Sequence, residues 1–437
     1  MDVVLTRPRT IRPGVRMYVR GRSVKLRGLR RAPVGVLRWL AILGPGVIAS
    51  VAGDDAGGIG TTSVVGARLG YDLLWLLLLL TVALAVVQEM AARLGAATGR
   101  GLLDLVRERY GIGWALLAVG VILLGNGGVV ATEFAGVAAA AELLGLSPSI
   151  AVLASALLVW LLVLFGSYSR AERIFLVMTL AFLAYPAAVL LAHPDWGDVA
   201  HGALVPDLRG DSAYLLLLVA MIGTTITPYQ QLFQQSAVVE QGVASRHYSA
   251  ERTDAYAGAV LGNLIWACVI IATAATLHAH GTTDIQSASD AAQALRPIAG
   301  DSAVGLFAVG LLGASMLAGG VVPLATAYSV SEAFGFRKGV GLDFRRAPVF
   351  YGLFSVLIVL GAAVAEWPGI PLIGLLVGIQ VLNGILVPIV LAFILLLASD
   401  RRLMGNLRNT SLQAVLGWGT LVLATAAVVV LLISQAT

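Results

Sequence analysis

Charged residues are scarce in this sequence. Asp, Glu, Lys and Arg make up 12% of its 437 residues, whereas hydrophobic residues make up 58%. A soluble chain of this length does not need so much apolar surface, so the composition excludes a soluble globular protein. It predicts an all-α polytopic membrane protein, in which long apolar helices cross the bilayer.

Cysteine and the common enzyme motifs are also lacking. The one cysteine, Cys268, excludes an intrachain disulfide and a thiolate cluster for a soft metal. The sequence has no nucleophile paired with a base, no His-Glu metal motif and no Gly-rich phosphate loop. We therefore expect no enzymatic activity and no resident cofactor.

Long apolar runs stand where charge is missing. Each holds roughly twenty apolar residues, enough for one bilayer crossing. Short connections rich in Gly, Pro, Asp and Arg separate them, as expected between helices. The eleven predicted spans lie near 39–66, 72–92, 113–140, 149–166, 172–192, 212–240, 254–280, 302–332, 348–366, 371–398 and 412–434.

The few charges alternate from one connection to the next. Basic residues gather in an arm over 1–38 and in every second connection, while acidic residues dominate the others. This positive-inside pattern predicts a cytoplasmic N-terminus and a multi-pass protein of the cell inner membrane or plasma membrane. The net charge of +5 therefore reflects topology, not nucleic-acid binding. We expect the basic arm to rest on anionic lipid, and no obligate protein partner is indicated.

Two spans are interrupted by residues that weaken a helix. The first contains Gly53-Asp54-Asp55-Ala56-Gly57-Gly58, and the sixth contains Thr224-Thr225-Ile226-Thr227-Pro228-Tyr229-Gln230. Carboxylates inside the membrane are costly and mark a functional site. Pro228 removes a helix hydrogen bond. Freed backbone groups and two carboxylates predict a cation site at the broken helices.

The two interruptions also predict how the chain is organised. They stand five helices apart, which is typical of an inverted-repeat transporter with its site near the membrane midplane. The transport core would cover 39–398, with repeats over about 39–192 and 212–398. Residues 399–437 would add a cytoplasmic loop and the eleventh helix.

Spans one, two and six carry distinctive motifs. These are Gly44-Pro45-Gly46, Asp55-Ala56-Gly57-Gly58, Gly66-Ala67-Arg68-Leu69-Gly70-Tyr71, Gln88-Glu89-Met90-Ala91-Ala92-Arg93-Leu94-Gly95, Thr98-Gly99 and Ser236-Ala237-Val238-Val239. They resemble the NRAMP family of divalent-metal transporters, and the likeness covers about residues 40 to 395. The resemblance implies a LeuT-like fold of two inverted five-helix repeats. It also implies transport of transition-metal divalent cations, usually coupled to protons.

The sequence departs from this family at both interruptions. The first-span motif of the family reads Asp-Pro-Gly-Asn, and its Asp and Asn bind metal; here Asp55 is kept, Ala56 replaces the Pro and Gly58 replaces the Asn. The sixth-span motif reads Met-Pro-His, and its Met sulfur binds metal. Here Thr227 replaces the Met and Tyr229 replaces the His.

The groups that carry protons in the family change as well. A second histidine of the sixth span matches Gln234, and the third-span acid of the proton path matches Val130. A neighbouring acid is retained as Glu133. With both histidines and one acid gone, the obvious proton carriers are missing, so we expect transport without proton coupling.

Loss of the methionine changes the metal that the site is expected to prefer. A thioether is a soft ligand that favours transition metals, and a hydroxyl in its place leaves an oxygen-only site. Gly58 in place of Asn is expected to enlarge the pocket. Mg²⁺ binds oxygen ligands and retains several waters, which suits two carboxylates in a roomy cavity. The pattern resembles the NRAMP-related magnesium transporters, which implies Mg²⁺ as the transported substrate with Mn²⁺ also accepted.

The resemblance and the chemistry together predict the metal-binding residues. Asp55 would be a ligand, Asp54 an added carboxylate, and Thr227 a hydroxyl ligand. Gln380 matches a family glutamine that approaches the ion when the site occludes. The full predicted set is Asp54, Asp55, Gly58, the Thr224 carbonyl, Thr227 and Gln380.

Other interpretations of these residues stay open at this stage. Asp55 is also a suitable helix cap, Thr227 can bond its own helix backbone, and Gln380 can be a packing amide. For function, the alternatives are a proton-coupled Mn²⁺/Fe²⁺ importer and an amino-acid carrier on the same fold. Two carboxylates at the break disfavour the amino-acid carrier, because they repel a substrate carboxylate.

Overall fold

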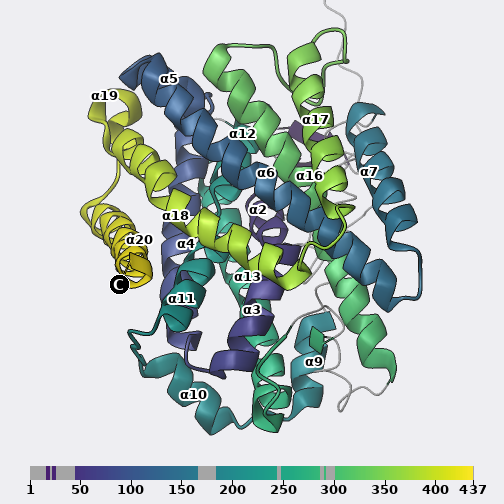
Figure 1. Cartoon of the computed structure of the whole chain (residues 1–437). Coiled ribbons are helices and arrows are strands. Elements are labelled where there is room, and N and C mark those ends of the chain that lie inside the picture. Colours follow the sequence, from purple (N-terminus) through teal and green to yellow (C-terminus); the bar gives the residue numbers. More distant parts are fainter. Residues whose placement is uncertain are drawn as a thin grey trace, which may run out of the picture.

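The computed structural model describes residues 16–19, 22–25, 45–165, 184–243, 248–285, 290–291 and 301–436. Almost all elements in this part of the chain are helices (Figure 1). From α2 to α10 they are α2 (Pro45–Gly53), α3 (Ala56–Leu69), α4 (Leu74–Thr98), α5 (Leu102–Tyr110), α6 (Ile112–Leu143), α7 (Pro148–Phe165), α9 (Ala184–Ala192) and α10 (Trp196–Leu204).

The second half of the chain continues the pattern. Its elements are α11 (Ser212–Thr225), α12 (Pro228–Glu240), α13 (Tyr248–Thr276), η3 (His278–His280), α16 (Asp301–Phe334), α17 (Pro348–Ala365), α18 (Leu372–Ser399), α19 (Arg401–Met404), η4 (Gly405–Leu407) and α20 (Ser411–Ala436). In the basic arm, β1 (Arg16–Val19) and β2 (Arg22–Lys25) pair antiparallel, a feature that the sequence did not predict.

Membrane-spanning length is confirmed for most of the predicted spans. Within the described residues, nine helical segments are long and apolar enough to cross a bilayer, with α11 and α12 together forming one of them. Span one consists of α2 and α3, each too short to cross alone. Span five falls mostly outside the described residues, and α9 is the part of it that the structure describes. The total of eleven therefore stays a prediction.

Both predicted helix breaks are present. α2 ends at Gly53 and α3 begins at Ala56, with Asp55 in extended backbone at φ −80° and ψ 173°. α11 ends at Thr225 and α12 begins at Pro228, with Thr227 extended at φ −72° and ψ 141°. Proline suits the first helical position because its missing N–H has no intrahelical partner there.

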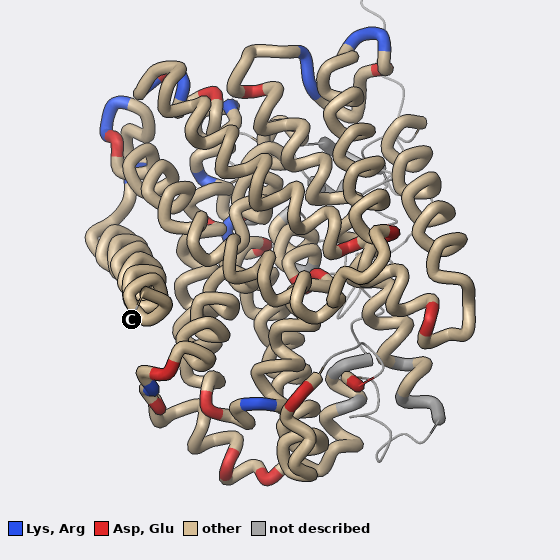
Figure 2. The backbone as a smooth tube through the Cα atoms, viewed as in Figure 1, with Lys and Arg blue, Asp and Glu red and all other residues tan. Residues whose placement is uncertain are grey.

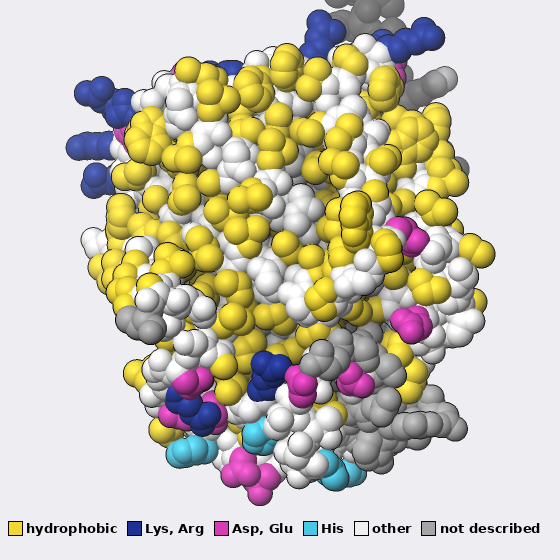
Figure 3. Space-filling view, in the orientation of Figure 1, with side chains coloured by type: hydrophobic (Ala, Val, Ile, Leu, Met, Phe, Trp, Pro, Cys, Tyr) yellow, Lys and Arg dark blue, Asp and Glu magenta, His cyan; other side chains and the backbone are white. Residues whose placement is uncertain are grey.

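Packing brings the two broken spans to the middle of the bundle. α13 lies along α2, α3 and α4, while α18 packs against α3 and α11, and α12 packs against α2, α4 and α16 (Figure 1). The outer helices α7 and α20 expose many leucine and valine side chains. Figure 3 shows such hydrophobic side chains spread over the middle of the visible face, as expected for a surface that meets lipid.

A buried ion pair connects the last helix to the core. On α4, Arg93 Nε lies 3.2 Å from Glu89 Oε1, and both side chains are almost fully buried. The Arg93 guanidinium also donates to the Leu407 carbonyl at 2.8 Å and to Asn409 Oδ1 at 2.6 Å. Gln413 Nε2 donates to Glu89 Oε2 at 3.1 Å. The segment leading into α20 is therefore held against α4 by charge-assisted hydrogen bonds.

Arg93→Ala is expected to destabilise the protein by about 3–5 kcal/mol, because it leaves the Glu89 carboxylate buried without its partner. The free energy of unfolding in detergent measures this loss. Arg401→Ala is the control: the side chain is exposed on α19, so its removal should change stability by less than about 0.5 kcal/mol. Equal stability of the two variants would contradict a structural role for the Arg93 network.

Candidate metal site

Asp55 joins three helices at the first break. Its Oδ1 accepts hydrogen bonds from the Gly58 backbone N–H at 2.6 Å and from Gln380 Nε2 at 2.9 Å. The Tyr229 hydroxyl lies 3.1 Å from Asp55 Oδ2 and 2.7 Å from the Ala52 carbonyl, so its one proton is shared between two acceptors. The cap that the sequence left open as an alternative is thus present: Asp55 caps α3, and it also contacts α12 and α18.

Asp54 is in a different situation. Its side chain is 1% exposed, and neither carboxylate oxygen has a hydrogen-bond partner among the described residues. It faces α13, since a Cβ built on Gly262 would lie 3.5 Å from Asp54 Oδ1. A buried carboxylate costs several kcal/mol unless a cation or hydrogen bonds compensate it. Asp54 is therefore a buried acid that a bound cation or a proton would neutralise.

The second break contributes oxygen atoms. The hydroxyls of Thr224 and Thr227 are buried. The Thr224 hydroxyl has no hydrogen-bond partner among the described residues, whereas Thr227 forms a capping box with Gln230 at the start of α12. The Thr224 carbonyl would normally accept from the N–H of residue 228, but Pro228 has none. The Thr227 N–H bonds Gln230 Oε1 at 3.1 Å instead of continuing the helix. The break thus leaves the Thr224 carbonyl and the Thr224 hydroxyl without helical partners.

Gln380 reaches the site from α18. Its amide nitrogen donates to Asp55, while its oxygen accepts from Asn383 Nδ2 at 3.1 Å. The approach depends on a glycine, because a Cβ on Gly57 would lie 2.4 Å from Gln380 Nε2. Gln380 therefore lies beside Asp55, with its oxygen turned toward Asn383 rather than toward Asp55.

The expectation of a roomier pocket at Gly58 is wrong. A Cβ built on Gly58 would lie 2.2 Å from Trp266 Cη2, so the indole of α13 occupies the space that a side chain would fill. Sequence reasoning missed Trp266, because no motif relates a residue in span seven to a glycine in span one. The same point lies 3.1 Å from Thr224 Oγ1, which confirms that the two breaks face each other.

Glu133 brings a third carboxylate to the first break. It lies on α6, is fully buried, and its Oε2 accepts from the Ala56 backbone N–H at 3.2 Å. The sequence signal was an isolated acid in an apolar run, although it indicated no role. None of the ion pairs found among the described residues involves Asp54, Asp55 or Glu133.

Contacts that hold α2 in place were also missed. The Gly46 N–H donates to Asp254 Oδ2 at 2.6 Å, and Gln88 Nε2 donates to the Gly46 carbonyl at 3.2 Å. Ser50 Oγ donates to Gln88 Oε1 at 2.8 Å. These side chains from α4 and α13 fix the short helix that leads into Asp54.

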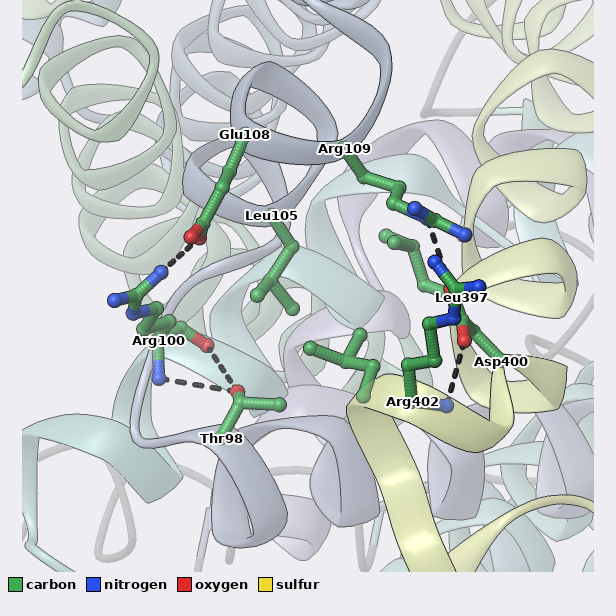
Figure 4. A pocket seen from close by; sticks show the side chains of 9 residues that line it. Thr98, Arg100, Leu105, Glu108, Arg109, Leu397, Asp400 and Arg402 are labelled. Atoms are coloured by element: carbon green, nitrogen blue, oxygen red, sulfur yellow. Dashed lines mark hydrogen bonds and ion pairs between the residues drawn. The ribbon is translucent and has the colours of Figure 1, made fainter.

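Two cavities among the described residues lie away from the breaks. Figure 4 shows one of about 430 Å³ between the ends of α4, α5, α18 and α19, where Arg100 binds Glu108 and Arg109 binds Asp400. Another, of about 620 Å³, is lined by His193, His201 and His278 at the opposite end. Within the described residues, no group of three or more His, Cys, Asp or Glu side chains is arranged to hold a metal. An ion at the breaks would thus depend on hydroxyl, carbonyl and water oxygens besides carboxylates.

The fold and the site define a class of protein. Two helices broken near the centre of a membrane bundle, with buried carboxylates and freed backbone groups facing each other, are typical of secondary transporters. A solved nucleobase-cation-symport-1 family transporter, MHP1, has this fold: the likeness has a TM-score of 0.58 at 15% identity and covers 90% of each chain. The LeuT-like architecture expected from the motifs agrees with this likeness.

The chain belongs to the Nramp family, since the family profile (Natural resistance-associated macrophage protein-like) matches residues 46–434. It is 32% identical over 409 residues to the divalent metal cation transporter MntH of Deinococcus radiodurans, covering 88% of both chains. The solved manganese transporter of Eremococcus coleocola shares the fold, with a TM-score of 0.73, 20% identity and coverage of 92% of this chain and 88% of that one.

Asp55→Asn separates the two roles of Asp55. The amide oxygen can still cap α3, whereas Asp55→Ala loses the cap as well, which costs about 1 kcal/mol. We expect Asp55→Asn to keep the melting temperature and to weaken Mn²⁺ binding at least about tenfold, measured by isothermal titration. Unchanged Mn²⁺ affinity would show that Asp55 is a cap alone.

Proposed function

We propose that this chain transports divalent metal ions across a cell membrane, with the ion bound between the two helix breaks. Its proposed ligands are the predicted set of Asp54, Asp55, Gly58, Thr224, Thr227 and Gln380; among these, the contacts of Asp55 with Gly58 and Gln380, and the closeness of Gly58 to Thr224, support the proposal. The buried and unpartnered Asp54 carboxylate is the single observation that carries the proposal. The name of the MntH relative, a divalent metal cation transporter, supports the same substrate class.

The distribution of charge supports an orientation. Figure 2 shows Lys and Arg gathered at the end that carries α5 and α19, while Asp and Glu outnumber them at the end that carries α10. By the positive-inside rule, the α5 end is cytoplasmic in a cell inner membrane or plasma membrane. A potential of 100 mV, negative inside, then favours entry of a divalent ion by about 4.6 kcal/mol.

The broken helices also support the proposed division of the chain. One break lies in each half, consistent with repeats over about 39–192 and 212–398 followed by the α20 helix. The basic arm over 1–38 falls mostly outside the described residues, so its contact with anionic lipid stays a proposal. The lack of enzymatic activity, of a resident cofactor and of an obligate partner stays an expectation as well.

Two cargo assignments compete, and Mn²⁺ belongs to both. Family membership favours a proton-coupled importer of Mn²⁺ and Fe²⁺, and the Glu133 carboxylate beside Ala56 supplies a group able to carry a proton. The donor set favours the other candidate, uncoupled uptake of Mg²⁺ with Mn²⁺ accepted. Carboxylate, hydroxyl and carbonyl oxygens suit a hard ion that keeps part of its water.

Flux in proteoliposomes distinguishes these candidates. The protein is reconstituted with an internal metal-sensitive dye in one set of vesicles and an internal pH dye in another. Mg²⁺ uptake without acidification supports the uncoupled magnesium carrier, whereas Mn²⁺ uptake with acidification that Glu133→Gln abolishes supports the proton-coupled importer. If the Asp54→Asn/Asp55→Asn variant transported Mn²⁺ and Mg²⁺ as fast as wild type does, the proposed transport site would be contradicted.

Thr227→Met tests the oxygen-only donor set. The methionine sulfur is a soft ligand, so we expect Mn²⁺ affinity relative to Mg²⁺ to rise at least about tenfold, measured by isothermal titration with each ion. Thr225→Met is the matched control, because the Thr225 hydroxyl already bonds the Met221 carbonyl at 2.8 Å within α11. An unchanged preference in Thr227→Met would show that residue 227 does not contact the ion.

A further inference from the structure

We propose that Trp266 determines which divalent ions this site accepts, because its indole takes the place of a side chain at position 58. The inference rests on the proposed transport function. It concerns a residue of α13, outside both broken spans and outside the predicted ligand set. Its basis is that the buried Trp266 ring fills the space that a side chain at position 58 would occupy, next to the proposed ion position.

A side chain at position 58 and the indole of Trp266 cannot occupy the same space. A Cβ on Gly58 would lie 2.2 Å from Cη2 and 2.4 Å from Cζ2 of the indole. Non-bonded carbon atoms prefer separations of about 3.5–4.0 Å, so even a methyl group at position 58 requires the ring to move. Trp266 is 1% exposed, and its helix packs along both α2 and α3. The ring therefore has little room to withdraw.

The contact lies at the site and not in remote packing. The Gly58 N–H donates to Asp55 Oδ1 at 2.6 Å. The position of the missing Cβ is 3.1 Å from Thr224 Oγ1, an oxygen without a hydrogen-bond partner among the described residues. The benzo edge of Trp266 thus lies beside Gly58, whose N–H binds the capping carboxylate of the first break and whose Cβ position faces the Thr224 hydroxyl of the second.

The ring edge changes what an ion meets on this side. Its C–H groups carry no lone pair, so the indole offers no ligand where an amide side chain would offer a carbonyl oxygen. An ion bound here keeps a water in that direction. Mg²⁺ gives up its waters reluctantly, so a site with one protein ligand fewer suits it. The rigid ring also limits the space open to Ca²⁺, which takes more ligands at longer distances.

A rescue experiment tests the pairing. Gly58→Asn alone places its side chain against the indole, and we expect it to weaken Mn²⁺ and Mg²⁺ binding more than about tenfold. Gly58→Asn combined with Trp266→Ala should recover Mn²⁺ binding. Because the amide oxygen now replaces a water, the ratio of the Mg²⁺ to the Mn²⁺ dissociation constant should rise at least about tenfold above wild type. Isothermal titration on the full-length protein measures both.

Trp266→Ala by itself keeps the inference testable if Gly58→Asn does not fold. Removing the ring widens the cavity, so we expect Ca²⁺ affinity relative to Mn²⁺ to rise at least about fivefold, a shift that loss of packing alone would not produce. Controls are Trp114→Ala, whose side chain is 54% exposed on α6, and Gly127→Ala, where an added Cβ meets nothing within 4 Å.

The outcomes separate this inference from the transport proposal. If wild type binds neither Mn²⁺ nor Mg²⁺, or if Asp54→Asn/Asp55→Asn binds them equally well, the transport proposal itself fails. Suppose that wild type binds Mn²⁺ and Mg²⁺ and that Asp54→Asn/Asp55→Asn does not. A Trp266→Ala protein with the ion preferences of wild type then overturns the role of Trp266. Failure of Trp266→Ala to restore binding to Gly58→Asn, in a double variant that folds, also overturns it.

Discussion

The packing of the helices at the first break depends on the hydrogen bonds of the Asp55 carboxylate. It is fully buried, yet it accepts hydrogen bonds from the start of α3, from α18 and from the hydroxyl of a tyrosine on α12. Such bonds to a charged acceptor are strong in a low-dielectric interior. They connect α3, α12 and α18, and the bond from the Gly58 N–H satisfies a backbone donor at the start of α3. The break in span one is therefore a stable structural element.

Asp54 shows what the same arrangement leaves uncompensated. The hydrogen-bond donors at the break bind Asp55. The Asp54 carboxylate, one residue earlier, is buried without any hydrogen bond among the described residues. At the second break, the buried Thr224 hydroxyl likewise has no hydrogen-bond partner among the described residues. Glu133 adds a third buried acid on the other side of the break. This imbalance is a physical argument for a cation, and it agrees with the family to which the chain belongs.

The motif replacements at the breaks acquire a different meaning in three dimensions. Gly58 was expected to add space, but the volume is filled by Trp266 from another helix. The replacement of a ligand by glycine is thus coupled to an apolar ring rather than to a larger cavity. The Thr227 side chain is buried at the second break, and its role as a ligand stays a prediction. In the selectivity that we propose, the groups that surround the ion matter as much as the groups that bind it.

The sequence by itself determined the membrane class, the helix breaks and their glycine, proline and carboxylate residues. These features are local: apolar length, alternating loop charge and helix-weakening residues act within one span. Only the tertiary structure decided that Tyr229 and Gln380 converge on Asp55, that Asp54 has no hydrogen-bond partner in the described part of the chain, and that Trp266 fills the space at Gly58. Contacts between distant spans depend on how helices rotate and pack against one another, and a hydrophobic pattern within each helix does not encode which side chain on a neighbour it meets.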